Sequence, residues 1–99
     1  MKVHLADEAE ADLEAIGDEI AKDNPARAAS FVRELRERCL GLGRFPKRFP
    51  LAPRYEKRGV RHCVHGNYLI FYRVEVEAVM VIHVLHGAMD YSRILFPSE

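Results

Sequence analysis

The sequence predicts an α+β domain in which an antiparallel helical hairpin packs on one face of an antiparallel sheet. Residues 9–20 and 28–42 carry apolar side chains at helical spacing, with almost no connector between the two segments. Three strand-like segments then follow one another between residues 60 and 86, separated by short turns. Two helices followed by a run of strands are typical of this class.

The N-terminal segment predicts a short strand followed by a helix. Residues Lys2–Leu5 place two aliphatic side chains on one face of an extended segment. Asp7 is expected to cap the helix, and Glu10, three residues later, completes a capping-box pattern. The helix is expected to end near Lys22. Its apolar stripe consists of Ala9, Leu13, Ile16 and Ile20.

The second helix begins almost at once. Asn24 is a favourable cap, and Pro25 suits the first helical position because the N–H that it lacks would have no partner there. Gly41 and Gly43 weaken the last turn, and Pro46 stops the helix. The apolar stripe consists of Ala28, Phe31, Leu35, Cys39 and Leu42. Two helices joined so closely are expected to run antiparallel.

A loop over Phe45–Lys57, with apolar anchors at both of its ends, leads into the sheet. The expected strands are Val60–His65, Tyr68–Val74 and Val79–His86, which form a three-stranded antiparallel meander. The middle strand is apolar on both faces, so both faces need a cover. The helical hairpin covers one face. The other needs the C-terminal segment Tyr91–Phe96 or another protein.

The length of 99 residues allows one domain, and the composition, 48% hydrophobic and 30% charged, is that of a folded globular chain. No apolar run reaches the roughly 18 residues that a membrane span needs. Acidic residues follow the N-terminus too soon for a signal peptide. We therefore expect a cytoplasmic protein without a membrane partner.

The net charge of zero hides a strong asymmetry along the chain. Residues 1–24 hold two basic and eight acidic residues, a net charge of −6, whereas residues 25–61 hold eleven basic and three acidic residues, a net charge of +8. The remaining residues 62–99 hold two basic and four acidic residues. This pattern indicates either an acidic partner for the middle segment or an acidic helix that neutralises a basic neighbour.

The residues that bind metals in other proteins show no ligand pattern here. The histidines form two pairs three residues apart on predicted strands, His62 with His65 and His83 with His86. Odd spacing on a strand sends side chains to opposite faces, so neither pair is expected to chelate one ion. The two cysteines fit no metal spacing and are expected to remain free thiols. We expect no metal and no cofactor, while a single histidine as a general base stays open.

A basic cluster lies in the loop and at the start of the next strand, at Arg54, Lys57, Arg58 and Arg61, beside Tyr55. Basic and aromatic side chains together suit RNA. A metal-free ribonuclease also needs a base and an acid, and this cluster supplies only the cations at the phosphate. The alternative is a solvated loop in which Arg61 pairs within the fold.

The order and spacing of short motifs resemble the ParE toxins of bacterial toxin–antitoxin pairs, within the wider RelE/ParE fold. In chain order these motifs are Ala9-x-x-Asp12-Leu13-x-x-Ile16, Asp23-Asn24-Pro25-x-x-Ala28-x-x-Phe31-Val32-x-x-Leu35, Phe45-Pro46, Gly59-Val60-Arg61, Gly66-Asn67-Tyr68-Leu69-Ile70-Phe71-Tyr72-Arg73-Val74 and His86-Gly87-Ala88-Met89-Asp90. The resemblance implies one ParE-like toxin domain over residues 1–99.

The resemblance also implies a function. ParE-like proteins inhibit growth, the best-described members poison DNA gyrase, and a ParD-like antitoxin neutralises them. RelE-like relatives instead cut mRNA on the ribosome, which is the alternative activity. One position departs from the family, because Met89 stands where ParE-like sequences usually carry Arg. Met offers no donors to phosphate or carboxylate. A third possibility is therefore an attenuated toxin fold that only binds antitoxin.

These readings assign candidate residues to each role. The antitoxin is expected on the Arg-rich outer side of the hairpin and on an uncovered apolar sheet face, through Phe31, Arg33, Leu35, Arg36 and Tyr72. The expected target-binding residues, for gyrase, are Arg58, Arg61, Met89, Asp90 and Arg93. In the nuclease alternative the candidate catalytic residues are Arg58, Arg61, His86 and Tyr91. No specific DNA binding by the toxin alone is expected.

Overall fold

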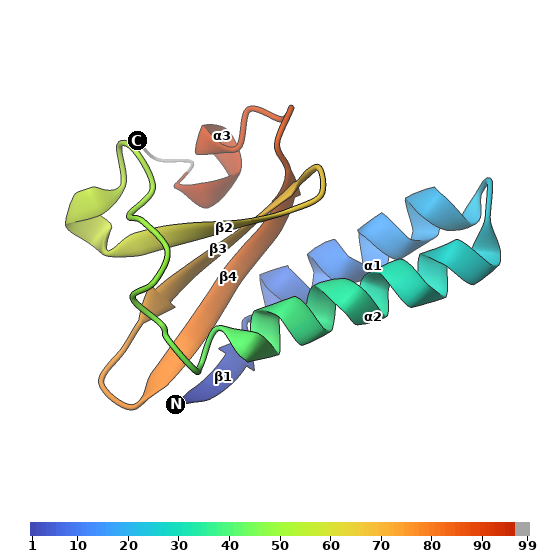
Figure 1. Cartoon of the computed structure of the whole chain (residues 1–99). Helices are drawn as coiled ribbons and strands as arrows, with labels where there is room; N and C mark the ends of the chain where they lie inside the picture. The colour runs from blue at the N-terminus through green and yellow to red at the C-terminus, as the bar shows by residue number, and fades with distance from the viewer. Residues whose placement is uncertain (97–99) are drawn as a thin grey trace.

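A computed structural model describes residues 1–96 and confirms the predicted class, with two long helices packed on a four-stranded sheet (Figure 1). The elements, in chain order, are β1 (Lys2–Leu5), α1 (Asp7–Ala21), α2 (Pro25–Gly41), the 3-10 turn η1 (Glu56–Arg58), β2 (Val60–His65), β3 (Tyr68–Val74), β4 (Ala78–His86) and α3 (Ser92–Leu95). The predicted strand bounds differ from these by one residue, at the start of β4.

The sheet is mixed, which corrects the expectation of an antiparallel sheet. Its strand order is β1-β4-β3-β2, and β1 runs parallel to β4 while the other pairs are antiparallel. After β1, the helical hairpin returns the chain to the end of the sheet at which β1 began. The last strand of the meander then lies beside β1. Val3 pairs with Val79 and Leu5 with Val81, which adds two aliphatic side chains to the face below the helices.

The start of α1 differs from the prediction. Ala6 occupies the cap position without a side-chain hydrogen bond, and Asp7 is the first helical residue. Glu10 makes no capping box because its carboxylate pairs with Arg36 of α2, at 2.8 Å. The start of α2 is as predicted, since the Asn24 side chain accepts a hydrogen bond from the backbone N–H of Arg27 at 3.1 Å.

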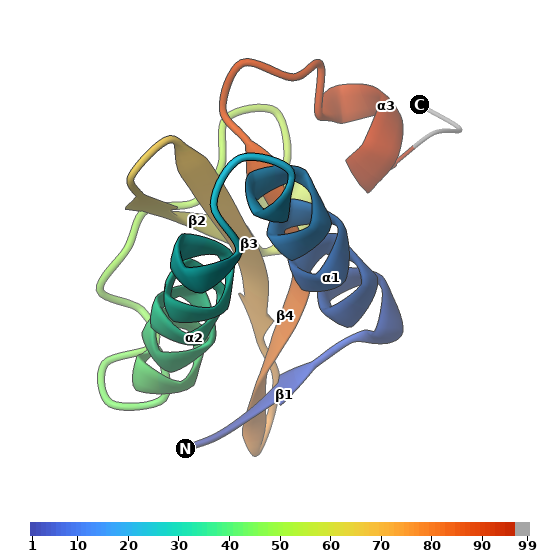
Figure 2. The same ribbon diagram turned by 90° about the vertical axis from the view of Figure 1, so that its right-hand side faces the viewer.

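The two long helices cover one face of the sheet, and the far end of their hairpin projects beyond it (Figures 1 and 2). Their apolar stripes and the facing strand residues form the main core. Its fully buried members include Leu13, Leu35, Cys39, Ile70, Tyr72, Val79 and Val81. Burial of this stripe against the sheet is the main stabilising term for helices of this length.

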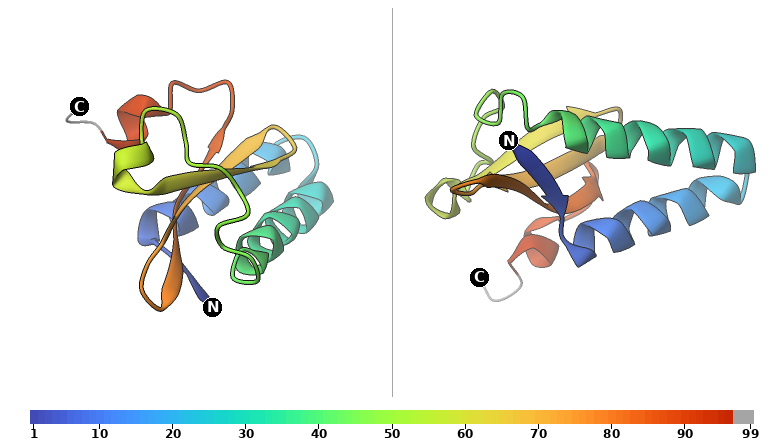
Figure 3. Two further views of the ribbon diagram at one scale, coloured as in Figure 1. Left: turned by 60° about the vertical axis from the view of Figure 1, so that its left-hand side comes forward. Right: turned by 90° about the horizontal axis from the view of Figure 1, so that it is seen from below.

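The reverse face of the sheet is covered by the chain itself, so the expectation that this face is free for a partner is wrong. Phe71 is fully buried there, with the Tyr91 ring 5.0 Å away between centroids. Tyr55 of the preceding loop stacks on Phe96 at 5.2 Å. Figure 3 shows α3 and the turn η1 lying on the side of the sheet opposite the long helices. Leu95 completes this second cluster.

Candidate protein-interaction surfaces

The four candidate catalytic residues are not brought together. Arg61 pairs with Tyr72 in the sheet register. His86 pairs with Tyr68, which lies four residues before Tyr72 in β3. This separation corresponds to roughly 13 Å along the strand. Tyr91 lies on the reverse face, within the second cluster.

Each of these side chains has a contact of its own within the fold. The backbone N–H of Ala88 donates to His86 Nδ1 at 3.1 Å, and the guanidinium of Arg58 lies 4.1 Å above the Phe96 ring. Arg61 donates from Nη1 to the carbonyl oxygens of Phe49 at 2.6 Å and Lys47 at 3.4 Å. The interpretation that Arg61 pairs within the fold is therefore confirmed, and the arginine is withdrawn from the target-binding set.

Leu35 and Tyr72 contribute no surface to a partner, which corrects two of the five candidate antitoxin contacts. Both side chains have an exposed fraction of 0%. Leu35 belongs to the buried stripe of α2, and Tyr72 points under the helices, where its hydroxyl donates to the Pro46 carbonyl at 2.7 Å. Burial raises the pKa of the Tyr72 hydroxyl.

The other three candidates differ in how accessible they are. Phe31 is half-buried, and its ring lies 5.6 Å from that of Tyr68. The guanidinium of Arg36 is bound to Glu10, an ion pair that lowers the pKa of the Glu10 carboxyl and raises that of Arg36. Arg33 is exposed. The outer side of the hairpin is thus less cationic than its sequence indicates.

The turn after β4 presents the remaining target-binding candidates. Asp90 accepts from Ser92 Oγ at 2.6 Å and lies 3.5 Å from Arg93 Nε. Met89 is 46% exposed and lines a groove of about 340 Å³. Two of the other lining residues, Asp12 and Glu19, are acidic. An arginine in place of Met89 would therefore face carboxylates of α1.

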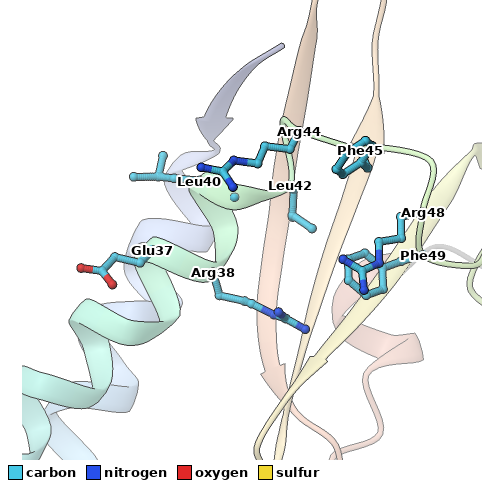
Figure 4. A pocket seen from close by; sticks show the side chains of 9 residues that line it. Glu37, Arg38, Leu40, Leu42, Arg44, Phe45, Arg48 and Phe49 are labelled. Carbon is cyan, nitrogen blue, oxygen red and sulfur yellow. The ribbon is translucent and has the colours of Figure 1, made fainter.

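Sequence reasoning missed a cavity of about 550 Å³ at the C-terminal end of α2 (Figure 4). It is lined by Glu37, Arg38, Leu40, Gly41, Leu42, Arg44, Phe45, Arg48 and Phe49. Phe45, expected to anchor the loop, is instead 69% exposed. The sequence signal that could have indicated this cavity is the pair Arg-Phe, which occurs twice between residues 44 and 49. We call this cavity the α2-end pocket.

Residues 1–96 contain no group of three potential metal ligands of the His, Cys, Asp or Glu type. Within the same part of the chain, no helix combines the length and the apolar character that crossing a bilayer requires. Cys39 and Cys63 are buried free thiols, and burial raises the pKa of the Cys39 thiol to about 12. Such thiols are poor metal ligands and poor nucleophiles.

Comparison with protein families gives a match over residues 3–91 to the model described as the ParE toxin of the type II toxin–antitoxin system parDE. The chain belongs to the ParE toxin family. A chain in the structure of the chromosomal ParDE system of P. aeruginosa is similar to this ParE-family toxin, with a TM-score of 0.75 and 22% identity. That likeness covers 87% of this chain and 95% of the other.

A second solved structure, the RelBE2 toxin–antitoxin complex of Mycobacterium tuberculosis, contains a chain with a TM-score of 0.58 and 26% identity to this ParE-family toxin. The likeness covers 86% of this toxin and 95% of that chain. The sequence matches none of the curated proteins with which it was compared. The protein is thus a ParE/RelE-type toxin of a type II toxin–antitoxin system.

Proposed function

We propose that this ParE-family toxin arrests growth by binding DNA gyrase and that a ParD-like antitoxin neutralises it. The family match over residues 3–91 carries this proposal. The best-described members of the family poison gyrase, and the match spans both helices and the whole sheet. No membrane partner, cofactor or sequence-specific DNA contact of the toxin alone enters the proposal.

The dispersal of the candidate catalytic residues supports binding over catalysis. Arg61 is held by the Phe49 carbonyl, and His86 lies at the opposite end of the sheet. Proton transfer in a ribonuclease requires a base and an acid within hydrogen-bond reach of one phosphodiester. In the binding mode, the surface that we assign to the target consists of Arg58, the turn that contains Met89 and Asp90, and Arg93 in the first turn of α3.

The test uses purified toxin, gyrase and relaxed plasmid. We expect loss of supercoiling and plasmid breaks that stay trapped on the enzyme. The matched variant is Asp90→Ala/Arg93→Ala, which alters two exposed side chains of the target surface and leaves the core intact. It is expected to weaken inhibition. Unchanged supercoiling without trapped breaks, at any ratio of wild-type toxin to gyrase, would show that gyrase is not the target.

The second candidate function is a ribosome-dependent mRNA endonuclease. The basic loop before β2 and the likeness to a chain of a RelBE2 complex favour it. Mapping mRNA ends after induction of the toxin distinguishes the two functions, because new ends at ribosome-occupied codons would support the nuclease. An unchanged set of ends would exclude it.

The third candidate is a toxin fold that only binds antitoxin, which the methionine at position 89 favours. Expression without antitoxin separates this candidate from the other two. Normal growth with soluble toxin present would support it, and growth arrest would exclude it.

A further inference from the structure

Three exposed arginines line the α2-end pocket. Within residues 1–96, Arg27, Arg36 and Arg93 are among the arginines that form ion pairs with carboxylates. None of the three arginines that line the pocket belongs to such a pair; they are Arg38, Arg44 and Arg48. The acidic residue of the lining, Glu37, points away from the arginine cluster (Figure 4). The pocket is therefore suited to receive carboxylates.

Aromatic and aliphatic side chains lie between these charges. The guanidiniums of Arg38 and Arg48 each lie 5.5 Å from the centroid of the Phe49 ring, which orders them around it. Phe45 stands beside them with most of its ring in solvent, and Leu40, 52% exposed, lies at the other end of the lining with its side chain directed away from Phe45 (Figure 4). An exposed apolar surface with a charged rim is typical of a protein-binding site.

The occupant that fits both features is an acidic peptide segment that carries an apolar side chain. A continuous polyanion fits less well, because the whole toxin has no net charge and a sequence pI of about 7.0, whereas nucleic-acid-binding domains are strongly basic. The acidic helix α1 lies beside α2 and would repel phosphates that continue beyond the pocket. Guanidiniums also match the planar carboxylate group through paired hydrogen bonds.

We propose that the α2-end pocket binds an acidic segment of the antitoxin, with one apolar side chain placed against the exposed Phe45 ring and carboxylates paired with Arg44 and Arg48. This inference rests on the proposed antitoxin partner. It moves the expected contact from the outer side of the helical hairpin, where Arg36 is already bound to Glu10, to the end of α2.

The test measures the affinity of full-length toxin for the antitoxin encoded in the neighbouring reading frame, by calorimetry. Arg44→Glu/Arg48→Glu is expected to weaken binding about tenfold or more, since two charge-assisted contacts become repulsive. Phe45→Ser is expected to weaken it without any change in charge. Lys57→Glu reverses a charge at an exposed position of η1 that does not line the pocket, and it should leave the affinity within about twofold.

Thermal melting of each variant checks the fold, which should be unaffected because both arginines and Phe45 are exposed. Wild-type affinity in Arg44→Glu/Arg48→Glu and in Phe45→Ser would overturn the inference while leaving the antitoxin partnership intact. A wild-type toxin that binds no antitoxin would contradict the partnership itself. A single-stranded RNA oligonucleotide serves as the competing probe, and loss of RNA binding with unchanged antitoxin binding in the charge-reversed variant would also overturn the inference.

Discussion

Asp12 of α1 contacts His83 of β4, with 2.7 Å between Asp12 Oδ2 and His83 Nδ1. The same oxygen accepts from the backbone N–H of Val84 at 2.9 Å. The sheet register is irregular here, because Phe71 pairs with His83 and Tyr72 with Val81, which leaves one extra residue in β4. The pairing of β4 with β1 ends at Val81, and beyond that point the Asp12 carboxylate provides an acceptor for the Val84 N–H.

Removing this carboxylate is expected to destabilise the fold. Asp12→Ala leaves the Val84 N–H unsatisfied in a largely buried setting, so we expect a loss of about 1–3 kcal/mol in the free energy of unfolding. Asp12→Asn keeps an acceptor oxygen and should cost less. Urea denaturation measures both variants. Asp18→Ala, an exposed position of the same helix, is the control, and equal midpoints for Asp12→Ala and Asp18→Ala would refute the assigned role.

Arg61 is expected to act on stability more than on target binding. Its hydrogen bond to the Phe49 carbonyl ties the loop before β2 to the sheet, beside the bond from Tyr72 to Pro46. Arg61→Ala should cost roughly 1.5–3 kcal/mol, as expected for hydrogen bonds from a charged donor. Lys57→Ala, in the exposed turn η1, should have little effect. A normal melting temperature combined with lost gyrase inhibition in Arg61→Ala would instead return this arginine to the target surface.

Two glycines near the end of α2 are expected to respond in opposite directions to alanine. A Cβ added to Gly43 would overlap the Met1 carbonyl oxygen, so Gly43→Ala must displace the backbone next to β1. We expect a loss of about 1–3 kcal/mol. A Cβ at Gly41 meets nothing within 4 Å, and in a helix alanine should add about 0.5–1 kcal/mol. Chemical denaturation of the pair tests this, and a destabilised Gly41→Ala would contradict it.

Buried Cys39 makes stability fall at alkaline pH. Its thiol has a pKa of about 12 in the folded chain, against an ordinary value of 9.0, mainly because burial disfavours the thiolate. Between these two values the folded state binds more protons than the unfolded state, so the free energy of unfolding decreases as pH rises. The slope approaches roughly 1.4 kcal/mol per pH unit. The stabilising contribution is fully present below the unfolded pKa.

Denaturation curves at several alkaline pH values measure this slope, and Cys39→Ala should make it less steep. Burial also raises the pKa of the Cys63 thiol and of the Tyr72 hydroxyl, so part of the slope remains. The native toxin should also leave Cys39 unmodified by a thiol reagent until it is unfolded. Rapid labelling of Cys39 in folded toxin would contradict the burial on which this expectation depends.

Capping residues and the spacing of apolar side chains predicted most of the helices and strands correctly. Asn24 and Pro25 mark the start of α2 because a cap acts within a few residues. The apolar middle strand β3 is central and covered on both faces, as its pattern requires. The apolar stripe of α2 that contains Leu35 faces the sheet. The prediction that Leu35 contacts a partner is therefore wrong.

The features that sequence did not reveal depend on distant contacts. The local sequence places Glu10 at the capping-box position, but Arg36 of the neighbouring helix binds its carboxylate instead. The exposure of Phe45 follows from where the loop crosses the end of α2; the two Arg-Phe pairs in the sequence indicate a surface segment there but not which phenylalanine is exposed. The sequence left two possible covers for the reverse face of the sheet, the chain's own C-terminal segment or another protein. The position of α3 in the fold shows that the C-terminal segment covers it.

The parallel pairing of β1 with β4 has a consequence for synthesis on the ribosome. Val3 meets Val79, so the first strand has no partner until almost the entire polypeptide has been translated. The helical hairpin, built from local contacts, forms early, while closure of the sheet waits for the last third of the chain. A nascent or prematurely terminated chain that lacks β4 therefore cannot assemble its central layer, and only nearly finished molecules carry the complete toxin fold.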